Sequence, residues 1–259
     1  MAGLYQFPEG QIIAFALVFL RIMAFVVAWP VFGTSNFPVH VKVLLALVLA
    51  MIQFPVTTFE NTQLIQINDQ IIFMSVRELC LGLALGFLMR MYFFAVSIAG
   101  EIMSVTMGLG AAQLYNPAMG SQSNVLEQFE VMLATLFFLV MNGHHLFLGG
   151  LAESFHLVPV AAIGLKTEAF ASITPMIQSI FLIGLKISAP VLVSIFLAQI
   201  AMGIIGRAVP QINVLVTSFP VTVLLGLAVL IVTTPLFVGE MDGLTNVMAA
   251  RFFQFMKVL

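Results

Sequence analysis

The sequence predicts an all-α membrane-associated protein built from long, kinked helical hairpins. Of its 259 residues, 61% are hydrophobic and only 8% are charged, whereas about a quarter of the residues in a soluble domain are charged. The apolar runs have helical periodicity, whereas barrel strands would alternate polar and apolar residues. Several runs are too short or too long for a simple crossing, which predicts hairpins packed obliquely and partly outside the bilayer.

Composition and motifs exclude several classes of function. Nucleic-acid binding requires clustered Lys and Arg, and the net charge of −2 argues against this function. The sequence has no phosphate-binding glycine loop, nucleophile elbow or plausible nucleophile–base pair, so we predict neither an enzyme nor a cofactor. Four residues lack the spacing of a metal motif and are interpreted as structural: His144, His145, Glu153 and His156.

The first predicted helix covers residues 12–29, with Arg21 near its middle and Pro30 at its end. Because no basic residue precedes Arg21, this run lacks the lead of a signal peptide and is expected to remain in the mature protein. After a short turn, residues 41–54 form a second helix of about 21 Å. That length falls short of a hydrocarbon core of about 30 Å. Residues 55–69 are polar and predict a turn.

The next run, residues 71–107, contains no proline and would measure about 55 Å as one helix. This is nearly twice the thickness of the bilayer core. We therefore expect the helix either to break near Gly82, Gly86 or Gly100, or to rise well beyond the bilayer. The four-residue spacing of Gly82 and Gly86 predicts a close helix-packing face. The lone cysteine, Cys80, lies in this run and excludes an internal disulfide.

The segment 107–124 is the one around which the chain is organised. It reads MGLGAAQLYNPAMGSQSN and contains no Lys, Arg, Asp or Glu. Its glycines and its proline predict irregular backbone, and unpaired backbone groups facing lipid cost several kcal/mol each. The segment is therefore either a loop in water or a segment enclosed by protein, where it lines or closes a cavity. The lack of charge, together with Leu114, Tyr115 and Met119, favours the enclosed segment.

Three further segments follow this loop. Residues 125–142 predict a helix whose early acidic residues suit the helix dipole. Residues 144–168 predict a short helix and a polar connection. Residues 175–208 would form a helix of about 51 Å, kinked at Pro190, before a turn at 209–213.

The last apolar run covers residues 214–234 and is expected to end at Pro235. The predicted helix breaks are Pro190, Pro210 and Pro220. The tail, residues 240–259, is amphipathic and is expected to lie on the membrane or to pack on a partner. Its apolar face carries Leu244, Met248, Phe252, Phe255 and Leu259.

Charged residues inside apolar helices form a second set of candidate functional residues. They are Arg21, Arg77, Glu78, Arg90, Glu101, Lys186 and Arg207. A charge at membrane depth costs roughly 3 kcal/mol and tends to face protein or water. The set could form a proton or ion relay, or pair between helices or subunits. Because both signs of charge are present, we favour pairing.

Several motifs together resemble the FliR family, the export-gate subunits of type III secretion. In chain order they are Gly100-Glu101 with Met107-Gly108, Asn116-Pro117, Asn142-Gly143-His144-His145 with Ser154-Phe155 and Pro159, Ala189-Pro190, and residues 207–214 (RAVPQINV) with Phe219-Pro220. No single motif is decisive, but the order runs through nearly the whole chain. Leu215 departs from the pattern, since the family often has an aromatic residue there.

The resemblance implies a subunit of a flagellar export gate in the bacterial inner membrane, at the flagellar basal body. Such subunits pack with FliP and FliQ in a helical assembly, partly raised toward the periplasm. FlhB docks on this assembly, and FlhA and the rod base are expected neighbours. Unfolded rod, hook and filament subunits pass through. The resemblance also implies one gate-subunit domain, with a FliP-like part over about 1–142 and a FliQ-like part over about 143–259.

By position, the family's pore-plugging loop matches residues 108–122 here. Glycines would let the loop swing, and apolar residues would seal it. The plug residues implied are Gly108, Gly110, Leu114, Tyr115, Asn116, Pro117, Met119 and Gly120. Glu101 and Arg90 would anchor the adjacent helices.

Three alternatives remain at this stage. A virulence injectisome paralogue would share the same motifs. A secondary transporter with broken helices around a midplane site receives some support from Pro190 and Pro220. In a purely structural scaffold, changes in the loop would affect assembly and not leakage.

Overall fold

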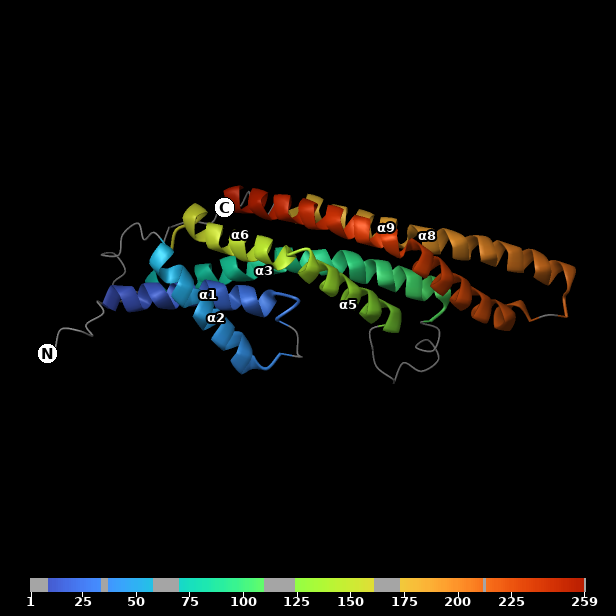
Figure 1. The fold of residues 1–259 in the computed structure, drawn as a ribbon, viewed down its shortest axis with the longest axis horizontal. Coiled ribbons are helices and arrows are strands. Elements are labelled where there is room, and N and C mark those ends of the chain that lie inside the picture. The colour runs from blue at the N-terminus through green and yellow to red at the C-terminus, as the bar shows by residue number, and fades with distance from the viewer. Residues whose placement is uncertain are drawn as a thin grey trace. The chain divides into compact units, whose positions relative to one another are not determined.

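The computed structural model describes residues 9–33, 37–57, 70–109, 124–160, 173–211 and 213–258. All regular elements in these ranges are helical (Figure 1). They are α1 (Glu9–Ala28), α2 (Val39–Gln53), the 3₁₀ turn η1 (Phe54–Val56), α3 (Gln70–Met107), α5 (Val125–Val140), α6 (Gly143–Leu157), α8 (Ile173–Ala208) and α9 (Val214–Val258). Five described helices are long and apolar enough to cross a membrane, or six if α5 and α6 form one broken span. The predicted all-α membrane class is confirmed.

The chain divides into two compact units that interleave along the sequence. Unit 1 comprises Met1–Met91, Asn142–Thr174 and Val247–Leu259, and unit 2 comprises Tyr92–Met141 and Pro175–Asn246. Each unit thus draws on both halves of the chain. The division near residue 142 into FliP-like and FliQ-like parts is a different partition, and it stays a prediction.

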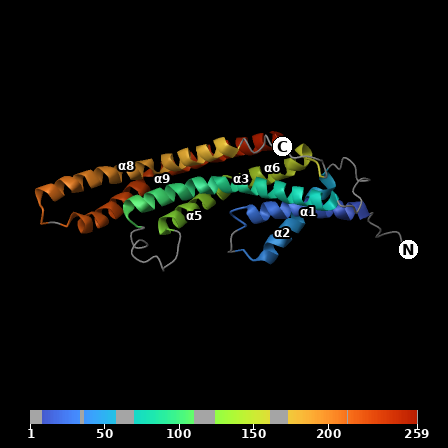
Figure 2. The ribbon, with the colours of Figure 1, turned by 180° about the vertical axis from the view of Figure 1, so that it is seen from behind.

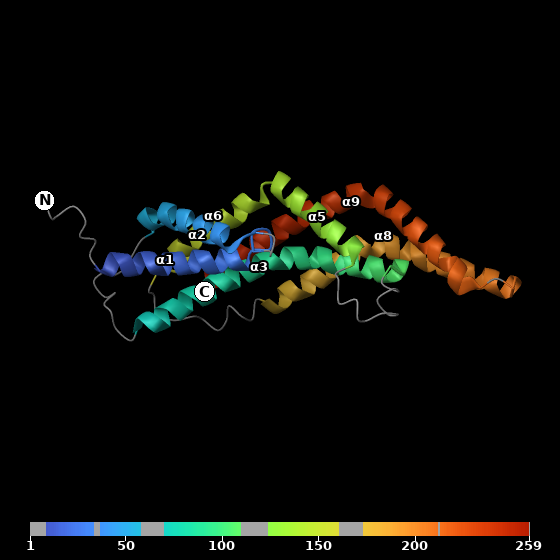
Figure 3. The ribbon, with the colours of Figure 1, turned by 90° about the horizontal axis from the view of Figure 1, so that it is seen from below.

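Unit 1 contains the hairpin of α1 and α2, which lie side by side (Figure 3), and a close contact of α1 with the first part of α3. A Cβ on Gly82 would meet the Arg21 carbonyl oxygen and would lie 2.7 Å from the Ala24 Cβ. A Cβ on Gly86 would lie 2.9 Å from the Phe25 carbonyl oxygen. Side chains at these positions would force the helices apart, so the predicted glycine packing face is confirmed.

Unit 2 contains the rest of α3, together with α5, α8 and most of α9. In this unit α8 and α9 are joined by the turn around Pro210 (Figures 1 and 2), and α9 bends away from α8 beyond this turn (Figure 3). A Cβ on Gly184 of α8 would lie 2.9 Å from the Ala95 carbonyl oxygen of α3, which shows how closely these helices cross. Large apolar side chains on α8 and α9 remain exposed, among them Phe196, Leu224 and Ile231. Apolar faces of this extent are typical of surfaces covered by lipid or protein.

Of the two alternatives for residues 71–107, the structure has the unbroken one: α3 is a single helix of 38 residues, about 57 Å long, without a break at its glycines. The expected end of the last apolar helix at Pro235 is wrong, because α9 continues through this residue. Pro190 lies inside α8, and Pro220 and Pro235 lie inside α9. Of the three predicted breaks, only Pro210 lies between helices, and the expected kink at Pro190 stays a prediction.

Hydroxyl groups beside two of these prolines donate to carbonyl oxygens one turn earlier in the same helix. The hydroxyl of Thr234, next to Pro235, donates to the Leu230 carbonyl oxygen at 3.0 Å. The Ser194 hydroxyl, one turn after Pro190, donates to the Pro190 carbonyl oxygen at 2.7 Å.

The expected placement of the amphipathic tail on a membrane or partner is also wrong. The tail is the last part of α9, and the described residues of its apolar face are buried within the chain: Leu244, Met248, Phe252 and Phe255. Leu259 lies outside the described residues. Phe252 is 1% exposed and packs edge-on against Phe147 of α6, with ring centroids 5.4 Å apart. Both rings belong to unit 1. Because unit 1 presents an apolar surface on α6, the tail buries its face there.

Candidate functional site

The candidate plug loop begins where α3 ends. Gly108 has a φ of +85°, in the left-handed region that favours glycine. Its N–H donates to the Val105 carbonyl oxygen at 3.1 Å, and the Leu109 N–H donates to the Ser104 carbonyl oxygen at 3.0 Å. This pair of hydrogen bonds is the Schellman arrangement, which ends a helix by satisfying its last carbonyl groups. The sequence Met-Gly-Leu therefore fixes the point at which the loop leaves α3.

Side chains of α9 hold this end of the loop within unit 2. The Thr222 hydroxyl lies 3.0 Å from the carbonyl oxygens of both Met107 and Phe219, so it can donate to either. A Cβ on Gly108 would lie 3.2 Å from the Phe219 ring. Met107 is fully buried and packs on Gly226. Sequence reasoning missed Thr222, whose only signal is its position two residues after the Phe219-Pro220 motif.

The other end of the loop is held on α3. Asn124, immediately before α5, donates from its side-chain nitrogen to a carboxylate oxygen of Glu101. Four residues earlier on α3, the Ser97 hydroxyl donates to Glu127 of α5. Between them, a Cβ on Gly100 would lie 2.7 Å from the Glu127 Cα. The loop therefore starts and ends on the last two turns of α3, and a glycine permits the close crossing with α5.

Most of the predicted plug residues lie outside the described part of the chain. Gly108 is described, at the loop's start. The others are Gly110, Leu114, Tyr115, Asn116, Pro117, Met119 and Gly120. The assignment of these residues to a plug stays a prediction.

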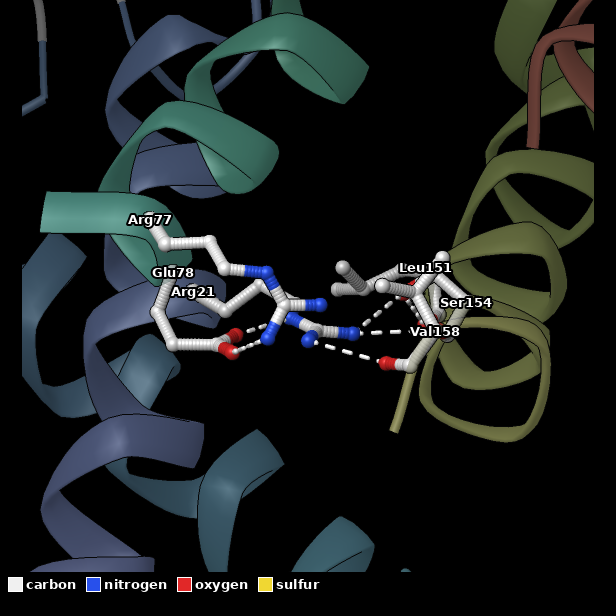
Figure 4. Close-up of polar contacts among 6 residues, drawn as sticks. All are labelled: Arg21, Arg77, Glu78, Leu151, Ser154 and Val158. Atoms are coloured by element: carbon white, nitrogen blue, oxygen red, sulfur yellow. Dashed lines mark hydrogen bonds and ion pairs between the residues drawn. The ribbon is translucent and has the colours of Figure 1, made fainter. Parts of the chain in front are cut away.

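A buried cluster of charges lies inside unit 1 (Figure 4). Arg21 of α1 and Glu78 of α3 are both 0% exposed, and the Arg21 Nε donates to the Glu78 Oε2 at 2.5 Å. The other edge of the Arg21 guanidinium donates to the carbonyl oxygens of Ser154 and Val158, each at 3.0 Å. These carbonyls belong to the C-terminal end of α6, where a positive charge is favourable, and the Ser154 carbonyl oxygen also accepts the Val158 N–H at 3.0 Å.

This cluster joins three helices through one side chain. Arg21 also lies over the Phe155 ring, with its Cζ 4.3 Å from the ring centroid. The Arg77 Nη1 lies 3.7 Å from the Glu78 Oε1, and all three guanidinium nitrogens of Arg77 lack a hydrogen-bond partner in the structure. Glu78 is thus the carboxylate that offsets two buried cations, a case in which removing one partner is costly.

The other four charged candidates are not brought into this cluster. Arg90, Glu101, Lys186 and Arg207 are exposed in the single chain. Glu101 contributes to the loop base described above. The sequence singled out Arg21, Arg77 and Glu78 by their apolar surroundings, but it could not reveal the α6 carbonyls that bond Arg21, because backbone atoms carry no sequence signal.

Together, these features define a membrane protein of several helical spans, in which an uncharged loop is fixed at both ends on one long helix. The sequence model of bacterial export proteins, family 1, matches residues 12–248. The chain therefore belongs to this family of bacterial export proteins, and the resemblance stated for the sequence is confirmed.

Curated relatives support the same assignment. The flagellar biosynthetic protein FliR of Bacillus subtilis is 37% identical over 222 residues, covering 85% of each chain. The protein of the same name from Escherichia coli is 32% identical and covers 84% of this chain and 82% of its own. That of Aquifex aeolicus is 30% identical over 255 residues, or 96% of this chain and 93% of its own.

Proposed function

We propose that this chain is a core subunit of the flagellar protein export gate and that residues 108–122 close its channel. Three observations support the proposal. The chain belongs to a family of bacterial export proteins. The similar proteins reported above are named for flagellar biosynthesis. Five of its described helices are suited to a membrane, which supports a position in the bacterial inner membrane.

The observation that carries the plug assignment is the anchoring of the loop. The Gly108 helix stop and Thr222 hold the chain where the loop begins, and the bond from Asn124 to Glu101 holds the chain two residues after the loop. The intervening sequence contains no charge. A loop with fixed ends and a neutral, partly apolar middle is suited to block a passage for unfolded chains, because it can be displaced without detaching.

The proposed partners follow from this role. FliP and FliQ would complete the channel, with FlhB docked on the assembly and FlhA and the rod base nearby. Unfolded rod, hook and filament subunits would be the substrates. The exposed apolar faces of α8 and α9 in unit 2 provide surface for lipid and for such neighbours. The assembly would be partly raised toward the periplasm.

Replacing residues 110–120 with a short Gly-Ser linker tests the proposal. Membrane vesicles carrying the altered gate should leak small ions, while co-purification with FliP and FliQ persists. A linker that retains Leu114, Tyr115 and Met119 at matched positions is the control and should leak less. If vesicles carrying the Gly-Ser linker did not leak ions, residues 108–122 would not be the plug. If the linker abolished co-purification with FliP and FliQ without causing leakage, a scaffold role would be favoured.

The rival functions receive less support. A transporter with broken helices is disfavoured because α8 and α9 continue through their internal prolines. A virulence injectisome subunit would share the family, but the relatives reported above are flagellar.

A further inference from the structure

A cavity of about 320 Å³ lies inside unit 2, among α3, α5, α8 and α9. Its walls are largely apolar and include Leu133, Ile187 and Phe237. This volume lies at the lower end of the range for small-molecule pockets. The cavity shares no lining residue with the loop base, although the Glu130 Oε2 also lies against Gly100 at the crossing of α3 and α5.

The deepest polar group on the cavity wall is a carboxylate. Glu130 of α5 is 3% exposed, and its Oε2 has no hydrogen-bond partner in the structure. The carboxyl group thus lies among apolar side chains with one oxygen unbonded. A buried carboxyl group without a partner is unfavourable in its ionised form, so it either keeps its proton or requires a cation or a donor to reach it.

The remaining polar atoms at the cavity are mostly acceptors as well. Pro190 lacks the N–H that would bond the Lys186 carbonyl oxygen within α8. The hydroxyls of Thr233 and Thr234 donate to carbonyls of their own helix, so their lone pairs remain available as acceptors. A ligand that matches this surface must therefore donate hydrogen bonds.

The charges at the cavity have the same implication. Glu130 and Glu240 line it together with Lys186, giving one excess negative charge if all three are ionised. Lys186 is exposed, and no ion pair joins it to either glutamate among the described residues. The cavity therefore attracts a cation, and Lys186 does not satisfy this attraction because it forms an ion pair with neither glutamate.

We propose that this cavity binds an organic ammonium group, with the charged nitrogen at Glu130 and an apolar body against Leu133, Ile187 and Phe237. A bare metal ion would leave the apolar walls without a partner, and a neutral apolar molecule would leave the carboxylate unpaired. An alkylammonium pairs its charged nitrogen with the carboxylate and packs its alkyl part against the apolar walls. The group could belong to a free amine or to a lysine side chain of another protein. The proposal does not depend on the function of the loop.

The test uses the full chain in lipid nanodiscs and 1-adamantylamine, a compact hydrocarbon cage with one ammonium, in equilibrium dialysis against empty nanodiscs. We expect saturable binding to one site. The neutral 1-adamantanol should bind about tenfold more weakly or worse, since it lacks the charge that pairs with Glu130. Absence of saturable binding, or equal binding of amine and alcohol, would overturn the proposal.

Variants localise the binding. Glu130→Gln should weaken binding about tenfold or more, and Lys186→Gln should strengthen it by removing the competing cation. Ile187→Phe fills the cavity, leaves Glu130 in place and should also abolish binding, which covers the case that Glu130→Gln does not fold. Glu153→Gln, at an exposed position of α6, is the matched control and should bind normally. Normal binding by both Glu130→Gln and Ile187→Phe would contradict the assignment.

The two sources of the ammonium are distinguished by repeating the dialysis on the chain within its purified membrane complex. A site for a free amine should bind 1-adamantylamine as tightly as in the isolated chain. A site filled by a neighbour's lysine should no longer bind the probe.

Discussion

The charge cluster of unit 1 and the loop base of unit 2 use charged residues in opposite ways. In unit 1, Arg21 and Glu78 are fully buried and bond to each other and to the end of α6. In unit 2, Glu101 is exposed and Glu127 half-buried, and both accept hydrogen bonds from neutral side chains. Removing one partner of a buried ion pair is strongly destabilising, whereas a hydrogen bond to a carboxylate that water can reach contributes only about 1 kcal/mol.

This difference indicates which of the two sets of contacts breaks more easily. Breaking the bonds at the loop base costs little and leaves the helices of unit 2 packed. Breaking the charge cluster would leave a buried cation without compensation. We therefore expect unit 1 to act as a rigid anchor and the loop base to rearrange first, and four variants test this expectation.

The largest effect is expected for Glu78→Leu, which leaves Arg21 and Arg77 buried without a carboxylate. The free energy of unfolding should fall by about 3–5 kcal/mol, measured by denaturant unfolding of the chain in detergent. Glu153→Leu, at an exposed position of the same unit, should change it by about 0.5 kcal/mol or less. If the double variant Arg21→Met with Glu78→Leu lost the full sum of the single effects, the two residues would not be coupled.

Gly82→Leu should have the next largest effect, because its side chain would meet the Arg21 backbone and the Ala24 side chain. The expected loss is about 1–3 kcal/mol, from overpacking of the contact between α1 and α3. Gly149→Leu on α6 is a matched control, since no atom lies within 4 Å of a Cβ there. Thermal unfolding of both variants checks this, and equal melting temperatures would contradict the close contact.

Gly108→Ala tests the helix stop at the start of the loop. Because Gly108 has a φ of +85°, an alanine should cost about 1–2 kcal/mol. We expect a small drop in melting temperature together with increased ion leakage, because the loop would leave α3 in a different direction. Gly203→Ala on α8, with open space around it, should leave both quantities unchanged or slightly raise the stability. If ion leakage were unchanged in Gly108→Ala, the helix stop would not contribute to closing the channel.

Asn124→Ala should have the smallest effect on stability, about 1 kcal/mol, because the lost hydrogen bond lies at a partly exposed carboxylate. Its effect on leakage should exceed its effect on unfolding. A double-mutant cycle with Glu101→Ala measures the pair directly, and we expect a coupling of about 0.5–1 kcal/mol. Additive effects on unfolding would show that the bond contributes nothing.

Local patterns predicted much of this fold, because run length and composition decide where helices form in an apolar chain. The glycine pair of α3 and the break around Pro210 were predicted by the same local rules. The continuation of α9 past Pro235 was not, since a proline ends a helix only when neighbouring side chains and packing cannot stabilise its turn. The prediction for the tail of α9 was wrong for a related reason: periodicity identifies an apolar face but not the surface that covers it.

The sequence by itself determined the all-α membrane class, the family and the uncharged loop, because these depend on composition and on the order of motifs along the chain. Tertiary structure alone decided which helices share a unit, that Arg21 bonds the end of α6, and that Thr222 and Glu101 hold the two ends of the loop. Those contacts join residues far apart in the chain, many through backbone atoms that every residue possesses. Only the packing of the helices selects which of those atoms meet.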